Sequence, residues 1–215
     1  MELRRFTGTP ALSAAVGCWL DAAVAAAGAE RRFVALAVGD STLPAYRQLA
    51  PLPAGMAVVC LDELSPPPAR PEAAFAARLR AVLPPTWASA LAPFEGRFGD
   101  PGEVDAALAD GGLAAAVCGL GPDGHVAFNQ PPEGGDSPTR LVELAGANLA
   151  RLGDVHPARA ALTLGMATIR AAGCLALVAS GEGKAAALGR LLDGPVGDDC
   201  PATHLRHHPS LTVFA

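Results

Sequence analysis

Charged and aromatic residues are scarce in this sequence. Of its 215 residues, 17% are charged and 5% are aromatic, while 51% are hydrophobic. Such a composition excludes intrinsic disorder, because a chain of this length can bury a full core without disulfides or metals. The formal net charge is −5 and no basic run occurs. Nucleic acid is therefore not expected as a partner, since it requires clustered cations or aromatic side chains that stack on bases.

Long hydrophobic runs and paired cysteine motifs are also missing. No uncharged apolar run reaches the roughly 18 residues of a membrane span, so we expect no membrane partner. The five cysteines are widely spaced and never form CxxC, which favours reduced thiols in a cytoplasmic protein over disulfides or zinc. Arg4-Arg5 precedes an apolar segment, as in an export signal, but Asp21 interrupts that segment. The pattern therefore predicts the first helix of a cytoplasmic domain.

The hydrophobic pattern predicts an α/β fold with a mostly parallel sheet. Runs that are apolar throughout are typical of strands buried on both faces, and here they alternate with helical segments. The expected strands are 33–38, 56–61, 113–118, 174–179 and 211–214, and the expected helices are 11–28, 72–83, 158–170 and 183–192. The proline-rich segments 65–71 and 84–93 are expected to be surface connections, and residues 1–215 a single domain.

Three expected strands end in polar loops, at the edge of the sheet where ligands bind in such folds. Gly39-Asp-Ser-Thr42 follows a strand and opens a helix. Its backbone N–H groups and hydroxyls suit a phosphate, although an ordinary helix cap has the same residues. Asp62-Glu63 follows the next strand, either as a base beside a structural partner or as a solvated strand end. The third loop begins at Gly119.

The loop from Gly119 admits two kinds of site. Residues 119–124 match the GxGxxG pattern of dinucleotide sites, but Pro131-Pro132 follows too soon for the helix that such a site needs. Asp123-Gly-His125 joins a carboxylate and an imidazole, which suits proton transfer near neutral pH or forms a hydrogen-bonded turn. The segment 203–209 carries three histidines without matching cysteine or carboxylate spacing, so no metal site is expected.

Gly119-Leu-Gly-Pro-Asp-Gly-His-Val-Ala-Phe-Asn-Gln-Pro131 closely resembles the signature loop of glucosamine-6-phosphate deaminases, GxGxDGHIAFNEP. That family shares a superfamily with 6-phosphogluconolactonases, whose loop has a Ser-Leu-Phe-Pro type of ending, so Phe128-Asn129 favours the deaminase side. Further matches run along nearly the whole chain. They are the phosphate loop at 39–42, Asp62-Glu63, Thr139-Arg140, and the segments 161–165, 181–184 and 201–209.

The resemblance implies a three-layer α/β/α sandwich and a phosphosugar substrate such as glucosamine 6-phosphate, isomerised from aldose to ketose with loss of ammonia. It implies that Asp62 moves the C2 proton, that Asp123 with His125 opens the sugar ring, and that Gln130 stands where a glutamate adjoins the histidine. The substrate- and phosphate-binding residues that it implies are Gly39, Ser41, Thr42, Gly121, Arg151 and Lys184. It implies no metal or organic cofactor, because a carboxylate and an imidazole cover the proton transfers.

Three departures from the family pattern leave alternatives open. Gln130 replaces the glutamate and cannot change its charge, which predicts slow deamination or a different substrate. Asp40 stands in the phosphate loop where the family favours glycine. The C-terminus is short and Val142 replaces a lysine of the allosteric site of hexameric deaminases, so we expect at most a homo-oligomer of low order. The alternatives are a 6-phosphogluconolactonase-type hydrolase and a sugar-phosphate binder without catalysis.

Overall fold

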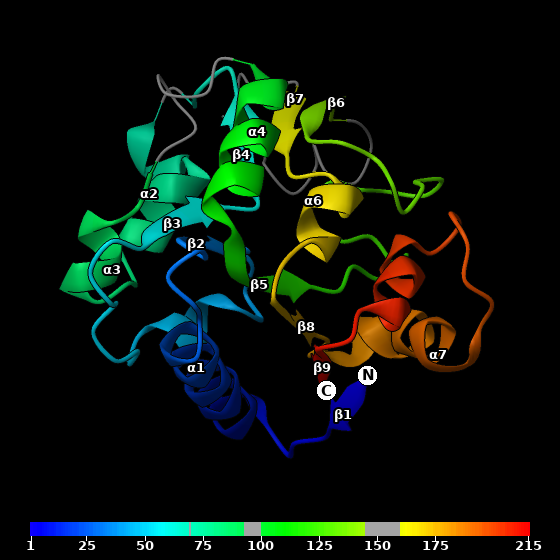
Figure 1. Ribbon diagram of the computed structural model, residues 1–215. Coiled ribbons are helices and arrows are strands. Elements are labelled where there is room, and N and C mark those ends of the chain that lie inside the picture. The colour runs from blue at the N-terminus through cyan, green and yellow to red at the C-terminus, as the bar shows by residue number, and fades with distance from the viewer. Residues whose placement is uncertain (69, 93–99, 145–159) are drawn as a thin grey trace.

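A six-stranded parallel sheet forms the centre of the protein (Figure 1). The structure is a computed structural model, and it describes residues 1–68, 70–92, 100–144 and 160–215. Every neighbouring pair of strands in this sheet is parallel. Across the sheet the order is β1 (Glu2–Arg4), β9 (Leu211–Phe214), β8 (Cys174–Val178), β5 (Leu113–Gly119), β2 (Phe33–Leu36) and β3 (Ala57–Cys60).

The strands at the centre of the sheet are buried on both faces. In β5 every residue before Gly119 is buried, and in β9 all four residues are. Successive side chains of a strand point to opposite faces, so both faces must be covered by other elements. The described helices are α1 (Thr9–Ala25), α2 (Phe75–Arg80), α3 (Pro85–Ser89), α4 (Pro101–Gly111), α6 (Met166–Arg170) and α7 (Ala185–Asp193). This arrangement confirms the expected α/β/α class.

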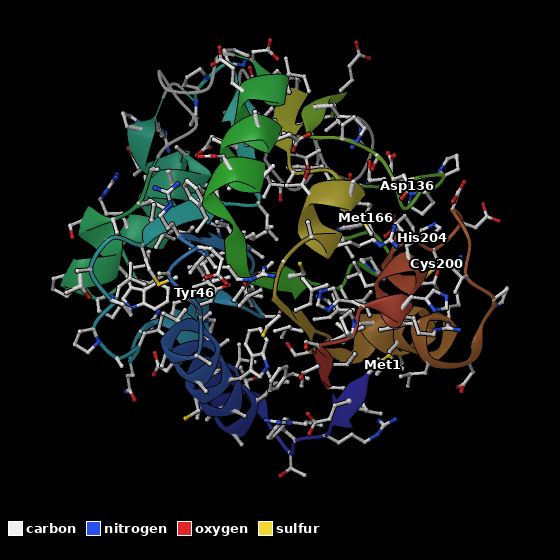
Figure 2. All side chains as sticks on the ribbon, in the orientation of Figure 1. Met1, Tyr46, Asp136, Met166, Cys200 and His204 are labelled. Carbon is white, nitrogen blue, oxygen red and sulfur yellow. The ribbon has the colours of Figure 1, made fainter. Side chains whose placement is uncertain are left out.

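Helix α1 illustrates how the sequence sets the packing. Leu12, Val16, Leu20 and Val24 recur every four residues and are all buried, so they form one apolar stripe along the helix. Burying each such side chain contributes about 1.5–3 kcal/mol of transfer free energy. The helix contacts β5 and the 3₁₀ turn Leu43–Tyr46, where Tyr46 is fully buried (Figure 2). No helix in the described ranges is long and apolar enough to cross a membrane.

A second, antiparallel sheet contradicts part of the sequence prediction. Its strands are β4 (Asp62–Ser65), β7 (Ala160–Thr163) and β6 (Arg140–Glu143), with β7 in the middle. The helix expected over 158–170 is therefore wrong for Ala160–Thr163, and of the described residues 160–170 only Met166–Arg170 is helical. Pairing of β7 on both edges outweighs the helix propensity of its alanines. Gly165 lies between the two elements. Its position requires glycine, because a Cβ there would lie 2.1 Å from the Ser137 carbonyl oxygen.

The proline-rich segment 84–93 also differs from its expected role as a plain surface connection. Its first half forms helix α3, with a proline in the first turn, where the missing N–H costs nothing. Trp87 of this helix is fully buried, and its ring nitrogen donates a hydrogen bond to the Ala50 carbonyl oxygen at 2.8 Å. The segment therefore adds an aromatic anchor to the core.

The chain reverses direction across the sheet between β2 and β5. These strands are neighbours, yet β2 leads to β3 on one side, whereas β5 leads to β8 on the other. Loops that leave the carboxyl ends of strands at such a switch point diverge and open a crevice. The polar loops that follow β2, β3 and β5 therefore meet at one place.

Candidate active site

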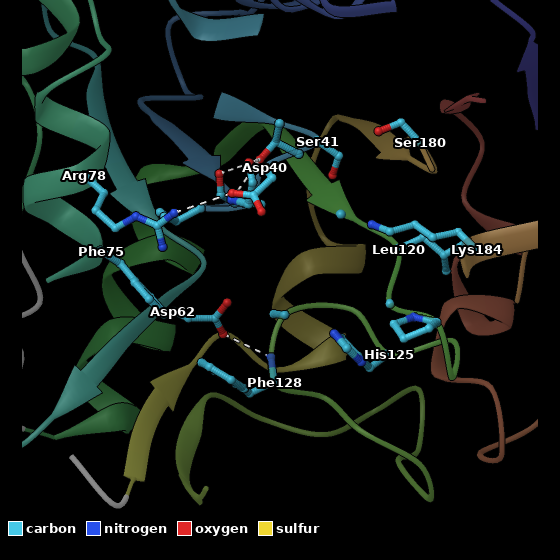
Figure 3. A pocket seen from close by; sticks show the side chains of 18 of the residues that line it. Asp40, Ser41, Asp62, Phe75, Arg78, Leu120, His125, Phe128, Ser180 and Lys184 are labelled. Atoms are coloured by element: carbon cyan, nitrogen blue, oxygen red, sulfur yellow. Dashed lines mark hydrogen bonds and ion pairs between the residues drawn. The ribbon is translucent and has the colours of Figure 1, made fainter. Parts of the chain in front are cut away.

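A cavity of about 670 Å³ lies at the carboxyl ends of these strands. Its walls come from the segments after β2, β3, β5 and β8, together with α2 (Figure 3). Most of the residues that the sequence singled out line it. These are Gly39, Ser41, Thr42, Asp62, Gly121, His125 and Lys184.

Asp62 begins β4 and presents its carboxyl group to this cavity. Its Oδ1 accepts hydrogen bonds from the Thr163 hydroxyl at 2.5 Å and from the Phe128 backbone N–H at 3.1 Å. Burial raises the pKa of Asp62 to about 7, although these two donors lower it in part. The carboxyl group can thus gain or lose a proton near neutral pH, as a general base or acid must.

Glu63, the neighbouring acid, has a different role. Its side chain is buried and accepts the backbone N–H groups of Phe75 at 2.9 Å and Ala76 at 2.8 Å. These donors belong to the first turn of α2, where N–H groups have no partner inside the helix. Glu63 therefore fastens α2 to β4, and neither acid of the Asp62-Glu63 pair is a solvated strand end.

Asp123 and His125 form a hydrogen-bonded pair in the loop that follows β5. The Nδ1 atom of His125 lies 2.6 Å from Oδ1 of Asp123, which also accepts the His125 backbone N–H at 3.1 Å. The pKa of Asp123 is lowered. Partial burial alone would raise it, but the hydrogen bonds and positive charge of His125 have the larger effect. Only His125 of this pair lines the cavity. With Nδ1 facing Asp123, Nε2 is the ring nitrogen that can meet a ligand.

Two glycines shape the loop that holds His125. A Cβ on Gly121 would lie 2.2 Å from Nδ1 of His125, so the ring requires glycine beneath it. Gly124 has φ +94°, and a Cβ there would lie 2.4 Å from Sγ of Cys200. The Gly124 carbonyl oxygen accepts the Ala202 backbone N–H at 2.9 Å. The glycines of the apparent GxGxxG pattern thus serve the histidine loop, and no helix opens within 120–139.

The two hydroxyl groups of the segment 39–42 have different roles: that of Thr42 is buried, and that of Ser41 faces the cavity. Thr42 is fully buried, its hydroxyl lies 3.0 Å from the Ala37 carbonyl oxygen, and it accepts the Gly39 N–H at 3.2 Å. Ser41, by contrast, points into the cavity on the side of Lys184 (Figure 3). The helix expected after this loop is only the 3₁₀ turn Leu43–Tyr46. An α-helix N-terminus therefore does not form here, and the loop offers its own backbone and the Ser41 hydroxyl.

Not every predicted site residue reaches the cavity. Gln130 is half-buried, does not line the cavity and forms no hydrogen bond within the described part of the chain, so it is not hydrogen-bonded to His125. Arg151, the expected phosphate ligand, lies outside the described residues. Asp123 approaches the site only through His125.

Sequence patterns did not indicate several residues of the site. Phe75 and Arg78 reach the cavity from α2, and the Phe75 ring stacks on Phe128 with centroids 6.2 Å apart. Thr163, the hydroxyl on Asp62, lies in the segment that was expected to be helical. No alternation of exposed and buried positions indicated Thr163, because β7 has only four residues and the last three of them are buried. No local pattern indicates Arg78.

The histidines near the C-terminus are separate from this cavity. His204, which Figure 2 places with Cys200 on the C-terminal segment beside α7, lies 2.9 Å from the Asp198 carboxylate through Nε2. His208 is buried and its Nε2 lies 2.7 Å from the Ala172 carbonyl oxygen. Among the residues that the structure describes, no group of three or more histidine, cysteine, aspartate or glutamate side chains could hold a metal ion.

The fold and its cavity place the protein among the α/β enzymes that bind a small polar ligand at a sheet switch point. Comparison with known proteins gives the finer assignment. The chain belongs to the family of glucosamine-6-phosphate isomerases and 6-phosphogluconolactonases, whose family model matches residues 9–213.

Bacterial relatives with curated names are similar over part or most of the chain. A glucosamine-6-phosphate deaminase of Streptomyces coelicolor is 35% identical over 200 residues, which cover 83% of this chain and 76% of the relative. One of Rhodopirellula baltica is 40% identical over 117 residues. That second alignment covers 52% of this chain and 47% of the relative, so it spans about half of each protein.

Solved structures share the whole fold at low identity. A monomeric glucosamine-6-phosphate deaminase superimposes with a TM-score of 0.87 at 23% identity, covering 100% of this chain and 96% of the other. A 6-phosphogluconolactonase of Thermotoga maritima gives a TM-score of 0.74 at 18% identity, covering 99% and 98%. Both deaminases and lactonases therefore have the architecture of this protein.

Proposed function

We propose that the protein is an aldose–ketose isomerase and deaminase that acts on an aminosugar 6-phosphate, such as glucosamine 6-phosphate. One observation carries this proposal: Asp62, whose pKa is about 7, and His125 face one cavity with Ser41 and Lys184. The names of the bacterial relatives and the Phe128-Asn129 sequence support the deaminase reading.

The phosphate of the substrate binds beside Ser41 and Lys184. Lys184 supplies a positive charge, and the Ser41 hydroxyl and the Gly39 loop backbone supply hydrogen bonds. We assign Arg151 to the same anion because of the family resemblance. With the phosphate held there, the sugar extends toward Asp62 and His125.

Ring opening is assigned to the Asp123–His125 pair. His125 delivers a proton to the ring oxygen and takes the proton of the C1 hydroxyl, which breaks the C1–O5 bond, leaves an aldehyde and restores the imidazolium form. Asp123, hydrogen-bonded to Nδ1, stabilises the imidazolium form that this step needs. A positioned acid–base group of this kind accelerates proton transfer by about 10²–10⁴.

Isomerisation and loss of ammonia follow at C1 and C2. Asp62 takes the C2 proton while the His125 imidazolium returns a proton to the oxygen on C1, which gives an enediol-type intermediate, and Asp62 then returns its proton to C1. The product has an imine at C2, and water replaces its nitrogen to leave a ketose phosphate and ammonia. A pKa of about 7 suits both transfers, because the carboxyl group must act first as a general base and then as a general acid.

A lactonase is the second candidate. Solved 6-phosphogluconolactonases share the fold, and Gln130 forms no hydrogen bond to His125 in the described structure, as a hydrolysis that needs no glutamate would tolerate. In that reaction His125 would activate water for attack on the lactone carbonyl, and Asp62 would be dispensable. A third candidate, binding without catalysis, predicts stabilisation by sugar phosphate without turnover.

A proton NMR time course of glucosamine 6-phosphate in D₂O separates the three. We expect loss of the C2 proton signal, then fructose 6-phosphate and ammonia, with Asp62→Asn slower by about 10²–10⁴. Asp110→Asn, an exposed carboxylate paired with Arg32 away from the cavity, is the matched control. An unchanged spectrum, combined with His125-dependent hydrolysis of 6-phosphogluconolactone, would make the protein a lactonase.

We also propose that residues 1–215 form one domain in the cytoplasm, as a monomer or an oligomer of low order. All five cysteines are free thiols, as a reducing compartment allows. A monomeric deaminase has the same fold, which supports the small assembly. Size-exclusion chromatography with light scattering tests the oligomeric state.

A further inference from the structure

An oppositely charged pair, Asp40 and Arg78, lies at the mouth of the cavity. Asp40 follows β2 in the phosphate loop, and Arg78 projects from α2. Nη2 of Arg78 lies 3.9 Å from Oδ1 of Asp40. The Asp40 side chain is fully exposed and the Arg78 side chain is 38% exposed. The mechanism above uses neither residue.

The two cationic side chains Arg78 and Lys184 stand on opposite sides of the cavity. Figure 3 shows Lys184 on the side of Ser41 and Ser180, and Arg78 on the side of Phe75 and Asp62. A phosphate bound at Ser41 and Lys184 therefore leaves Arg78 close to the other end of the sugar. That end carries the carbons on which Asp62 acts.

The geometry of the pair leaves both groups available to a ligand. At 3.9 Å the nitrogen and oxygen are further apart than the 2.7–2.9 Å of a direct charge-assisted hydrogen bond. An exposed ion pair of this kind adds little to folding stability.

We propose that Asp40 and Arg78 form a specificity subsite for the amino-substituted end of the sugar. The ammonium on C2 donates to the Asp40 carboxylate, and Arg78 donates to the neighbouring sugar oxygen. An amine that is cationic near pH 7 beside an oxygen is complementary to an anion beside a cation. This inference rests on the proposed function for the place of C2 near Asp62. It deepens that function by naming what selects an aminosugar phosphate over its hydroxyl analogue.

Binding calorimetry with two ligands tests the subsite in the Asp62→Asn background, in which the proposed turnover is suppressed. Glucosamine 6-phosphate and glucose 6-phosphate differ only in the group on C2. We expect the Asp62→Asn protein to prefer the amino sugar by about tenfold, because a hydrogen bond to a charged group is worth this much. Asp40→Asn should reduce the preference to about twofold, and Asp40→Glu should restore most of it. Asp110→Asn, an exposed acid outside the cavity, should leave the preference unchanged.

Arg78 has a separate test. Arg78→Gln should weaken both sugar phosphates by about tenfold and leave the affinity for inorganic phosphate within about twofold, because inorganic phosphate fills only the Lys184 side. Arg78→Lys should recover part of the sugar affinity. A large loss of inorganic phosphate affinity in Arg78→Gln would instead make Arg78 a phosphate ligand and overturn the subsite.

The outcomes separate this inference from the proposed deaminase activity. Equal affinity of the Asp62→Asn protein for the two sugars, or a preference that persists when Asp40→Asn is added, overturns the subsite even if the unmodified protein releases ammonia. An Asp40-dependent preference without ammonia release supports the subsite and removes the deaminase activity. Far-ultraviolet circular dichroism of each variant confirms that it is folded, as expected for such exposed side chains.

Discussion

Thr163 donates its hydroxyl hydrogen to Oδ1 of Asp62 across 2.5 Å, although 101 positions separate them in the chain. The antiparallel register of β4 and β7 places the two residues directly opposite each other. A hydrogen bond to a carboxylate favours its charged form, so Thr163 offsets part of the effect of burial on the pKa of Asp62. Strand pairing within the second sheet therefore adjusts the acidity of the carboxyl group that begins β4.

Replacing Thr163 by valine should move the pH dependence of turnover. Without the hydroxyl the pKa of Asp62 should rise above about 7, since burial then acts unopposed by this donor. The acidic limb of the kcat profile should shift upward by about one pH unit, given the usual strength of a hydrogen bond to a charged group. Thr163→Ser keeps the donor and serves as control. A limb that stays in place would show that Asp62 is not the base.

Asp62→Asn should make the folded protein more stable in neutral solution. Folding raises the pKa of this carboxyl group from 3.8 to about 7. A raised carboxyl pKa gives stability that is fully present below about pH 4 and is lost as the pH rises through 7. The variant should therefore gain about 1–3 kcal/mol over the unmodified protein at pH 8, and little at pH 4. Urea unfolding at both pH values measures this, and an equal difference at both would contradict it.

Gly124→Ala should destabilise the protein and distort the histidine loop. The residue has φ +94°, and the added Cβ would press against Sγ of Cys200 at 2.4 Å. Gly181→Ala is the matched control, because φ is +101° there but no atom lies within 4 Å of the Cβ. Backbone strain costs about 1–3 kcal/mol in both variants, and overpacking adds a similar amount only in Gly124→Ala. Equal unfolding free energies would mean that Cys200 moves aside without cost.

Gln130→Glu should change turnover by no more than about twofold. The side chain at 130 does not line the cavity and forms no hydrogen bond to Asp123 or His125 in the described structure. Substitutions away from a site's contacts alter free energies by only about 0.5 kcal/mol. Steady-state ammonia release by both proteins is the measurement. A gain of about 10² or more would show that residue 130 reaches the histidine during the reaction, as the family's glutamate is expected to do.

Segments with one dominant pattern were predicted well from the sequence. The strand over 211–214 has the expected bounds, and β2, β3, β5 and β8 agree to within two residues at each end. Their apolar runs allow little else than burial on both faces. The β7 segment failed because four alanine-rich residues carry no periodic signal of their own. Its pairing partners lie far away in the sequence, so only their contacts decide its conformation.

Local sequence indicated some features of the candidate site, and contacts between distant segments decided the others. The sequence by itself determined that Asp62, His125, Ser41 and Lys184 follow strands of a parallel sheet, since short polar loops after apolar runs are local features. Tertiary structure alone decided that Thr163 and Phe128 hold the Asp62 carboxyl group and that Arg78 faces Asp40. The tertiary structure also decided that Gln130 does not line the cavity. These relations depend on packing between distant segments, and burial, which sets the acidity of Asp62, exists only once those segments have packed.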